Sequence, residues 1–400
     1  MMHGFEFYTP TRVIFGAGSL EKLPEAVGRC GAKRVFVIYG GQSAKKSGTL
    51  DRVEALLTGA GIAFAAIGGV KPNPRLGLAR EAIREAIAFG ADLILAVGGG
   101  SVIDTAKATA HGTANPEADI WDIWMGKVKL EKSLPVGVVL TIPAAGSEMS
   151  DSAVLTDEAA LAKRGLNADL NRPAFALMDP ALAATLPARQ AACGVTDIMM
   201  HTLERYVNPL ENDMTDEIAE ALLRVVIRHG EAVVKNPSNI DAMSEIMWAG
   251  SLSHNNLTGL GGKKDFSVHQ FGQAIGEKFD IYHGETLSAM WASYARYVAP
   301  TNFARFARYA RNVWGIVEAD DEKAAMAGID ATEAYFKRLG MPVRIAELSC
   351  GVQDEAGLYD LALRCSRNRG RTIGSFRVLD FEDMLNVYIL YFISLFFILF

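Results

Sequence analysis

Cysteine is scarce in this chain of 400 residues, which has only four. They lie far apart and include no C-x-x-C pair, which excludes a disulfide framework or a zinc ribbon built on Cys30, Cys193, Cys350 and Cys365. Free thiols in a reducing compartment are expected instead. The N-terminus lacks the basic start and apolar core of a signal peptide, so the sequence predicts a cytoplasmic location.

The chain also lacks a surplus of basic residues. It has 40 Lys and Arg against 46 Asp and Glu, a formal net charge of −6, which argues against nucleic acid as a partner. Half of the residues are hydrophobic and 22% are charged, as in a globular protein. The length exceeds one typical core, so two domains are expected. No repeat or low-complexity linker interrupts them.

A long membrane-spanning run is missing too, although the chain ends on an unusual segment. Residues 387–400 are nearly all apolar and show no amphipathic period. They are fewer than the ~20 residues that cross a bilayer, so no membrane is expected for the core fold. We expect a shifted reading frame or another corrupted end, which could be deleted with a gain in solubility and no loss of turnover. A buried terminal helix or a membrane-associating tail are the alternatives.

Short apolar runs and helical runs alternate through the first half of the chain. Runs of this kind predict parallel strands covered on both faces, at residues 34–39, 62–67, 92–97, 136–142 and 174–178. Residues 76–89 have apolar positions three to four apart, as a helix between strands would. Strand signals disappear from about residue 188. The sequence therefore predicts a Rossmann-like α/β domain over residues 1–187 and an all-α domain over residues 188–400.

Three of the seven histidines combine with one aspartate in a pattern typical of a metal site. Asp197 and His201 are four apart in a segment of helical composition, so they share a helix face. His269 and His283 follow in the same predicted domain. One carboxylate and three imidazoles suit a divalent Fe or Zn ion and leave room for a substrate oxygen. The alternative is a helix-surface pair and two ordinary polar histidines.

A glycine-rich turn marks a candidate phosphate site. The apolar run that starts at residue 93 leads directly into Gly98, Gly99, Gly100 and Ser101, and helix formers follow. Glycines let backbone N–H groups approach a phosphate, and the N-terminus of a helix favours an anion. Taken alone, such a turn is equally typical of a plain connector between strand and helix.

Together these segments resemble the iron-containing (group III) alcohol dehydrogenases, within the dehydroquinate-synthase-like superfamily. The nearest likeness is to the butanol dehydrogenase and broad-range aldehyde reductase branch. The segments that carry the resemblance are residues 11–19, 72–74, 98–107, 141–149, 163–165, 177–180, 194–197 with His201, 265–269 and 283–284. The resemblance implies a dinucleotide-binding domain, a helical domain whose Asp197, His201, His269 and His283 hold the metal, and a homodimer.

The resemblance also implies which residues bind the cofactor. The backbone of residues 98–101 would cradle the pyrophosphate, and Asp104 would lie near the nicotinamide. The other positions that match the family's cofactor cleft are Gly40, Gly41, Ser43, Asn73, Thr141, Ser147 and Lys163. Without the resemblance, a solvated lysine is the plain interpretation of Lys163.

The end of the first predicted strand favours NADP over NAD. An acidic residue there would hold the ribose 2′-hydroxyl and repel a 2′-phosphate. This chain instead reads Tyr-Gly-Gly-Gln-Ser-Ala-Lys-Lys over residues 39–46, with a hydroxyl at Ser43, two cations and no carboxylate. Gln42 stands where that branch often has glycine. NAD stays the alternative, with an ordinary glycine turn and exposed lysines as the plain interpretation.

The resulting prediction is a metal-dependent oxidoreductase that interconverts short-chain primary alcohols and aldehydes, such as butanol and butanal, and reduces aldehydes with NADPH. The metal, Fe²⁺ or Zn²⁺, would act as a Lewis acid on the substrate oxygen. The family commonly has a further histidine four residues after His269, where this chain has Gln273, which cannot titrate near neutral pH. We predict a substrate contact for Gln273. A polyol-phosphate dehydrogenase or a dehydroquinate synthase-like lyase, with Lys263 and Lys264 near the metal, is the first alternative, and a non-catalytic protein is the second.

Overall fold

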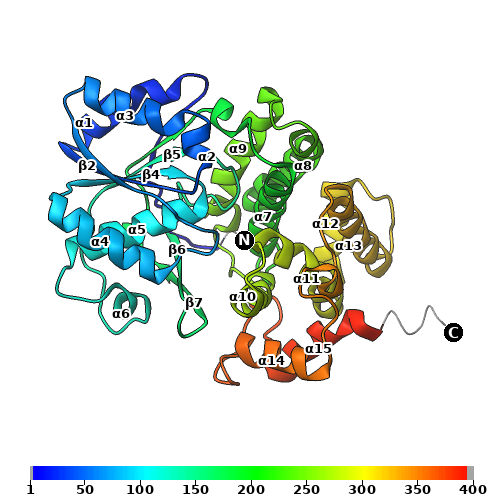
Figure 1. Ribbon diagram of the computed structural model, residues 1–400. Helices are drawn as coiled ribbons and strands as arrows, with labels where there is room; N and C mark the ends of the chain where they lie inside the picture. Colours follow the sequence, from blue (N-terminus) through cyan, green and yellow to red (C-terminus); the bar gives the residue numbers. More distant parts are fainter. Residues whose placement is uncertain (1–2, 394–400) are drawn as a thin grey trace. The chain divides into compact units, whose positions relative to one another are not determined.

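The computed structural model describes residues 3–393 and divides the chain into two compact units (Figure 1). We call them the sheet unit, Tyr8–Pro187 with Asn236–Asn255, and the helical unit, Ala188–Lys235 with the described parts of Met1–Phe7 and Asn256–Phe400. One edge between the units falls at Pro187, where the sequence places its boundary. The segment Asn236–Asn255 lies beyond that point and nevertheless groups with the sheet.

The sheet unit is built on six parallel strands in the order β1-β8-β5-β4-β2-β3. Five of them lie within two residues of the predicted runs, namely β2 (Arg34–Tyr39), β3 (Ala63–Ile67), β4 (Leu93–Gly98), β5 (Val136–Leu140) and β8 (Phe175–Met178). The edge strand β1 (Arg12–Phe15) was not predicted, because none of its residues is fully buried and its apolar signal is weak.

Helices cover both faces of this sheet, which explains why its central strands are apolar at almost every position. Figure 1 shows α1 (Leu23–Arg29) and α3 (Thr49–Gly59) on one face, and α4 (Leu76–Phe89) and α5 (Gly100–Ala114) on the other. Every residue of β4 and β5 is buried. The predicted fold class, an α/β domain followed by a helical one, is confirmed.

An antiparallel hairpin, β6 (Ser152–Asp157) and β7 (Ala162–Asn167), adds a second small sheet that was not predicted. β7 reads Ala-Lys-Arg-Gly-Leu-Asn, which has neither an apolar run nor a clear alternation. The hairpin pairs Thr156 with Lys163 and so carries one of the candidate cofactor residues.

Helices make up the regular structure of the helical unit, and the described chain has no strand after β8. Its helices are α7 (Ala188–Tyr206), α8 (Asp213–Lys235), α10 (Ser267–Phe279), α11 (His283–Val298), α12 (Phe303–Trp314), α13 (Asp321–Arg338), α14 (Glu355–Cys365) and α15 (Phe381–Ile393). α9 (Ile240–His254) belongs to the sheet unit. The four cysteines are free thiols, as predicted.

The apolar C-terminal run begins inside α15. Val387 and Tyr388 are buried, and the Tyr388 hydroxyl donates a 3.1 Å hydrogen bond to the carbonyl of Phe271. Of the alternatives for residues 387–400, the burial of Val387 and Tyr388 favours a buried terminal helix for this part, and the expectation that the run can be removed without loss stays a prediction. Residues 394–400 lie outside the described chain. Within residues 3–393, no helix combines the length and apolar character needed to span a membrane.

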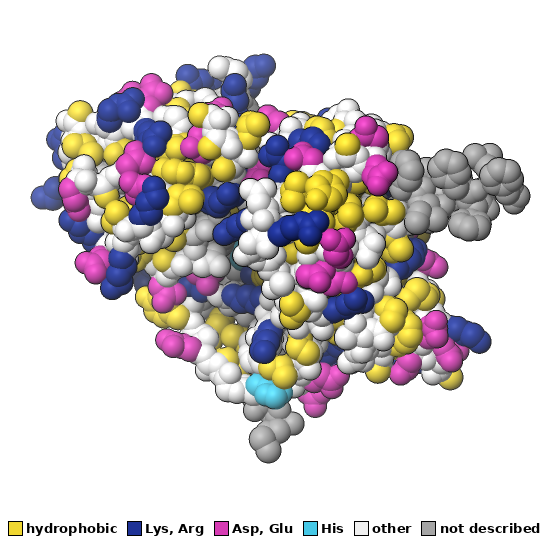
Figure 2. Space-filling model, turned by 90° about the horizontal axis from the view of Figure 1, so that it is seen from below, with side chains coloured by type: hydrophobic (Ala, Val, Ile, Leu, Met, Phe, Trp, Pro, Cys, Tyr) yellow, Lys and Arg dark blue, Asp and Glu magenta, His cyan; other side chains and the backbone are white. Residues whose placement is uncertain are grey.

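Charge is mixed on the surface that Figure 2 shows. Lys and Arg side chains lie interspersed with Asp and Glu on that face, together with scattered apolar side chains. The nearly balanced count of 40 basic and 46 acidic residues leads to such a distribution.

Candidate metal and cofactor sites

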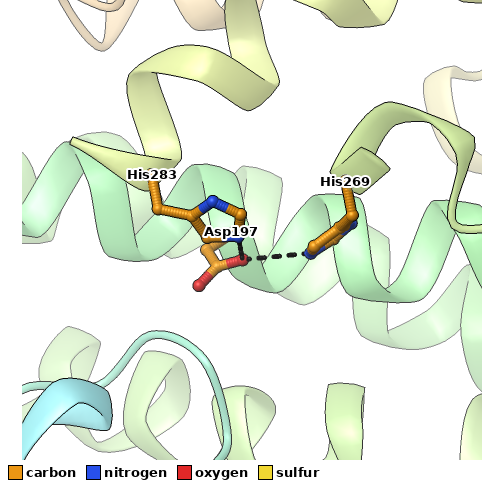
Figure 3. Close-up of side chains that lie close together, drawn as sticks. All are labelled: Asp197, His269 and His283. Atoms are coloured by element: carbon orange, nitrogen blue, oxygen red, sulfur yellow. Dashed lines mark ion pairs between the residues drawn. The ribbon is translucent and has the colours of Figure 1, made fainter. Parts of the chain in front are cut away.

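Three of the predicted metal ligands form a compact group in the helical unit. Asp197, His269 and His283 each offer one ligand atom, and these atoms all lie within 4.8 Å of one another. Asp197 Oδ1 lies 3.6 Å from His269 Nε2 and 3.9 Å from His283 Nε2, with its carboxylate turned toward both rings (Figure 3). The three residues come from α7, α10 and the first position of α11.

The fourth predicted ligand, His201, lies beside this group. Its Nδ1 is 3.5 Å from Asp197 Oδ1, one helical turn away in α7. Its ring stacks on that of His269, with centroids 4.5 Å apart. The structure does not place a nitrogen of His201 among the three clustered ligand atoms, so its part as fourth ligand stays a prediction.

Glycines let the three helices approach closely enough for the group to form. A Cβ added at Gly284, directly after His283, would lie 2.6 Å from Cys193 Cα in α7. A Cβ at Gly272 in α10 would lie 2.6 Å from Thr286 Oγ1 in α11. Since real Cβ atoms do not come this near, larger residues at either position would push the ligand-bearing helices apart.

The geometry of the group fits a divalent metal ion. Asp197 Oδ1 and His269 Nε2 are buried, and neither has a hydrogen-bond partner in the described chain. Leaving such an atom without a partner costs about 1–3 kcal/mol. An ion that holds N and O ligands at about 2.0–2.2 Å places them roughly 3–3.5 Å apart, close to the 3.5–3.9 Å between Asp197 Oδ1 and the three histidines. A carboxylate with imidazoles suits Fe²⁺ or Zn²⁺.

A second carboxylate, from Glu204, contacts the other side of His269. It lies against His269 Nδ1 and accepts backbone hydrogen bonds from Val268 N at 2.6 Å and His269 N at 3.2 Å. The sequence analysis missed Glu204. Its position seven residues after Asp197, two helical turns along the same face of α7, could have pointed to it.

The carboxylates make the surroundings of His269 favourable for positive charge. Burial alone would lower the pKa of His269, but the carboxylates of Glu204 and Asp197 outweigh that effect and raise the pKa to about 9. Burial raises the pKa of Glu204 above its ordinary value. A proton and a metal ion therefore compete for the same nitrogen, because a histidine ligand must be deprotonated at the atom that binds.

Gln273 lies one turn after His269 in α10. Its amide nitrogen donates to Glu277 Oε1 at 3.2 Å, and the side chain is half-buried. Its role as a substrate contact stays a prediction.

The predicted cofactor segments meet at one edge of the large sheet. β2 and β4 are neighbours, with Tyr39 paired to Val97. Gly40, Gly41 and Ser43 follow β2, and the segment Gly98–Ser101 runs from the last residue of β4 into α5. From β2 the chain crosses first to β3 on one side and then to β4 on the other. Dinucleotides bind at such reversals of strand order, outside the carboxyl ends of the strands.

The glycines at the end of β4 also have a packing role. A Cβ at Gly98 would lie 2.5 Å from Val102 Cγ2, and one at Gly99 would lie 2.7 Å from Ile142 Cβ. Thr141 N donates to Gly98 O at 3.1 Å, so the predicted residue Thr141 borders this turn. The turn leads into α5, whose N-terminal amides form a site suited to a phosphate.

A buried polar network joins α5 to the segment between β5 and β6 and to the start of β6. Asp104 accepts from the Ser147 hydroxyl at 2.6 Å and from Val154 N at 2.9 Å. Lys107, which the sequence analysis did not single out, donates to Ser147 Oγ at 2.8 Å and to the carbonyl of Ser152 at 2.7 Å. Burial lowers the pKa of Lys107 to about 8. The network fixes both Asp104 and Ser147, two of the predicted cofactor residues.

Two further predicted residues, Asn73 and Lys163, contact each other. Lys163 Nζ donates to Asn73 Oδ1 at 3.0 Å, and both side chains are buried. The interpretation of Lys163 as a solvated lysine is therefore wrong. Asn73 has a φ of 58°, in the left-handed region that asparagine tolerates better than most residues.

α9 joins the sheet unit by packing on the turn before Ser147. Gly146 has a φ of 63°, and a Cβ there would lie 2.5 Å from the carbonyl oxygen of Gly250 in α9. His254 Nδ1 lies 2.8 Å from the carbonyl oxygen of Ala145. These contacts explain why a helix late in the sequence groups with the first domain.

Two family models match the chain. One, described as iron-containing alcohol dehydrogenase, matches residues 10–180, and the other, described as the C-terminal part of the Fe-containing alcohol dehydrogenase family, matches residues 190–389. The first range includes the glycine-rich turn and the second includes the clustered aspartate and histidines.

Named proteins are similar along nearly their whole length. NADH-dependent butanol dehydrogenase A of Clostridium acetobutylicum is 36% identical over 390 residues, 97% of this chain and 99% of that protein. NADPH-dependent aldehyde reductase YqhD of Escherichia coli is 35% identical over 349 residues, 86% of this chain and 89% of that protein. The crystal structure of NADH-dependent butanol dehydrogenase A from Thermotoga maritima has a TM-score of 0.92 and 32% identity, over 97% of this chain and 98% of that one.

Proposed function

Because this chain belongs to the iron-containing alcohol dehydrogenase family, we propose that it reduces short-chain aldehydes such as butanal with NADPH at a divalent metal site. It is an oxidoreductase that interconverts alcohols and aldehydes with a nicotinamide cofactor. The observation that carries the proposal is the convergence of Asp197, His269 and His283 around buried atoms that lack hydrogen-bond partners. Reduction is the proposed direction because cells usually keep NADPH reduced.

In the proposed mechanism the chain supplies a rigid ligand set and orients the reactants. Asp197, His201, His269 and His283 would hold Fe²⁺ or Zn²⁺, which when bound supplies Lewis acidity toward a substrate oxygen. Asp197 offsets part of the positive charge, and the histidines are neutral donors. The backbone amides at the start of α5 would hold the pyrophosphate. The protein's remaining task is to align the nicotinamide with the aldehyde carbon and keep water out.

The preference for NADPH rests on the segment after β2. No carboxylate follows Tyr39 up to Lys46, and Ser43, Lys45 and Lys46 offer a hydroxyl and two cations to a 2′-phosphate. Lys45 Nζ lies 5.1 Å above the ring of Tyr39, which keeps it next to the end of the strand. Similar proteins are named for NADH as well as for NADPH, so this segment, and not the likeness, supports the choice.

The test is NADPH oxidation with butanal under anaerobic conditions, using metal-stripped protein reloaded with Fe²⁺ or Zn²⁺. We expect metal-dependent turnover that is lost in His283→Ala and kept in His229→Ala, a control histidine in α8 outside the ligand group. The metal that restores turnover identifies the active ion, and a higher kcat/KM with NADPH than with NADH is expected. Absence of turnover with either metal, despite tight NADPH binding, would overturn the substrate assignment and direct the search to phosphorylated substrates.

We also propose that the protein is a homodimer, as the family resemblance implies. Light scattering during size-exclusion chromatography should then give twice the chain mass of 43.2 kDa. A mass of one chain would contradict this.

A further inference from the structure

We propose that Glu204 is a positioning residue for the metal site, whose carboxylate fixes the ring of His269 so that Nε2 presents its lone pair beside Asp197. This inference rests on the proposed metal-dependent function. Glu204 itself does not belong to the clustered ligand atoms, and it acts through His269.

The ring of His269 lies between two carboxylates of the same helix. Glu204 contacts Nδ1, and Asp197 Oδ1 lies 3.6 Å from Nε2. A carboxylate accepts but does not donate when ionised, so the proton of a neutral ring belongs on Nδ1, next to Glu204. That tautomer leaves the lone pair on Nε2, the nitrogen that faces Asp197. Carboxylates placed behind metal-binding histidines fix tautomer and ring orientation in this way.

Glu204 also fixes the backbone that carries His269. α10 begins after Phe266, which has a φ of 56° and provides no side-chain cap. The backbone N–H groups of Val268 and His269 donate instead to Glu204 Oε1, at 2.6 and 3.2 Å. A negative charge at this end of a helix is favourable. The N–H of Ser267 donates to Asp265 Oδ1 at 3.0 Å. One carboxylate from α7 therefore holds both the next two N–H groups of α10 and the ring of its metal ligand.

A purely structural cap is the competing explanation, and Glu204→Gln separates the two. Glutamine keeps an oxygen that can accept from Val268 N and His269 N. Its amide group can place N–H donors toward His269 Nδ1, which would then act as acceptor and move the ring proton to Nε2. The variant should therefore keep the start of α10 and lose the tautomer that binds metal. Glu204→Ala would lose both the acceptor for Val268 N and His269 N and the carboxylate beside His269 Nδ1.

The control must remove a buried charge elsewhere in the same unit. Glu220 in α8 is equally buried, at 1% exposure, and accepts hydrogen bonds from the Tyr206 hydroxyl and from Arg308 Nε. It contacts none of the clustered ligands in the described structure. Glu220→Gln thus reports what losing one buried carboxylate does to stability without touching the metal site.

The measurement is the Zn²⁺ dissociation constant of the full chain, by competition with a chromophoric chelator, together with the Tm of the metal-free protein. We expect Glu204→Gln to bind Zn²⁺ 10- to 100-fold more weakly than wild type, while its metal-free Tm falls no further than that of Glu220→Gln. Wild-type affinity in Glu204→Gln would overturn the inference and leave only a cap. Failure of the wild-type chain to bind Zn²⁺ would instead overturn the proposed metal site itself.

Wild-type protein provides a second readout, should Glu204→Gln not fold. With ¹⁵N-labelled histidine and bound Zn²⁺, His269 should show an Nδ1–H proton that exchanges slowly with water, because it is held in a buried, charge-assisted hydrogen bond. Rapid exchange of that proton would overturn the inference.

Discussion

The hydroxyl of Ser147 donates a 2.6 Å hydrogen bond to Asp104. The same oxygen accepts a 2.8 Å hydrogen bond from the buried ammonium group of Lys107. Asp104 and Lys107 are three residues apart on one face of α5 and carry opposite charges, and the Ser147 hydroxyl forms a hydrogen bond with each of them. These two bonds connect α5 to the segment after β5. Since Asp104 and Ser147 are both candidate cofactor contacts, the network connects the packing of the sheet unit with cofactor binding.

Removing that hydroxyl should affect stability and cofactor affinity together. In Ser147→Ala, Lys107 loses one of its acceptors and Asp104 loses a donor, which should cost about 1–3 kcal/mol in the free energy of unfolding. We expect the NADPH dissociation constant, measured by nucleotide fluorescence, to rise about tenfold, the equivalent of roughly 1.4 kcal/mol. Ser150→Ala is the matched control, because Lys107 contacts only the backbone carbonyl of Ser150. A lower Tm of Ser147→Ala with unchanged NADPH affinity would show that the network stabilises the fold but does not contribute to cofactor binding.

Features of the fold and of the candidate site could be predicted from the sequence where they depend on residues close together in the chain. The spacing of Asp197 and His201 predicts a shared helix face because helix geometry repeats within a few residues. Apolar runs located five of the six strands of the large sheet for the same reason. The contact of His269 with Asp197 depends on packing between distant helices, and only the family resemblance placed the two together. Glu204 lies on the same helix face as Asp197, so the helical period could have predicted it, although it was not among the predicted residues.

Features that depend on distant partners could not be read from the sequence. Lys107 looks like an ordinary helix former, and its burial is possible only because acceptors from residues 147–152 surround its ammonium group. Likewise, nothing near α9 indicates that it packs on the turn at Gly146. The strand β7 gives no periodic signal because Lys163 is the one buried residue among its six, and that residue is polar.

A negative charge placed after β2 should weaken NADPH use specifically. Ser43 is exposed at the start of the short helix α2 (Ser43–Lys46), two residues beyond the glycine pair. In Ser43→Asp, a carboxylate would repel a 2′-phosphate, so kcat/KM with NADPH should fall at least tenfold relative to NADH. Ser43→Ala separates this repulsion from the loss of the hydroxyl and should change the ratio much less. An unchanged ratio in Ser43→Asp would show that the 2′-phosphate does not bind here.

Introducing a titrating group at position 273 should change the pH dependence of turnover. Gln273 lies one turn beyond His269, where the family commonly has a histidine. In Gln273→His, the imidazole would titrate near its ordinary pKa of about 6.5, and a new inflection near that pH is expected in kcat/KM for aldehyde reduction. Gln270→His, on the same helix, is the control. If both variants keep the wild-type profile, position 273 does not relay protons to the substrate.

Truncation within α15 should destabilise the helical unit. A chain that ends at Asn386 loses the buried side chains of Val387 and Tyr388, which should lower the free energy of unfolding by at least ~3 kcal/mol relative to a chain that ends at Ile393. Tyr388→Phe keeps the ring against Phe271, 5.1 Å between centroids, and loses only the hydroxyl hydrogen bond, at about 1 kcal/mol. Calorimetry distinguishes these effects. Equal Tm values for the two truncated chains would contradict the packing of α15 on α10.

Acid should destabilise the sheet unit through His111. This residue of α5 is completely buried, with Nε2 2.8 Å from Asn171 Oδ1 and Nδ1 2.8 Å from Ser133 Oγ. Burial lowers the pKa of His111 to about 4, from an ordinary value of 6.5. As the pH falls below 6.5, His111 therefore becomes protonated in the unfolded chain, while in the folded chain it stays neutral until the pH approaches 4. The contribution of neutral His111 to stability is complete above pH 6.5 and declines as the pH falls toward 4.

The size of this effect can be isolated with His111→Gln, which removes the titration and keeps polar atoms in the same cavity. At pH 5 the wild type should have lost about 2 kcal/mol through His111 relative to neutral pH, a fall of roughly 4–8 °C in Tm. The Tm of the variant should be lower than that of the wild type at pH 7. On acidification to pH 5 it should fall by roughly 4–8 °C less than the Tm of the wild type. Both proteins are measured free of metal, so that the histidines around Asp197 contribute equally. Parallel Tm curves for the two proteins between pH 7 and pH 5 would show that His111 accepts its proton in the folded state as readily as in the unfolded one.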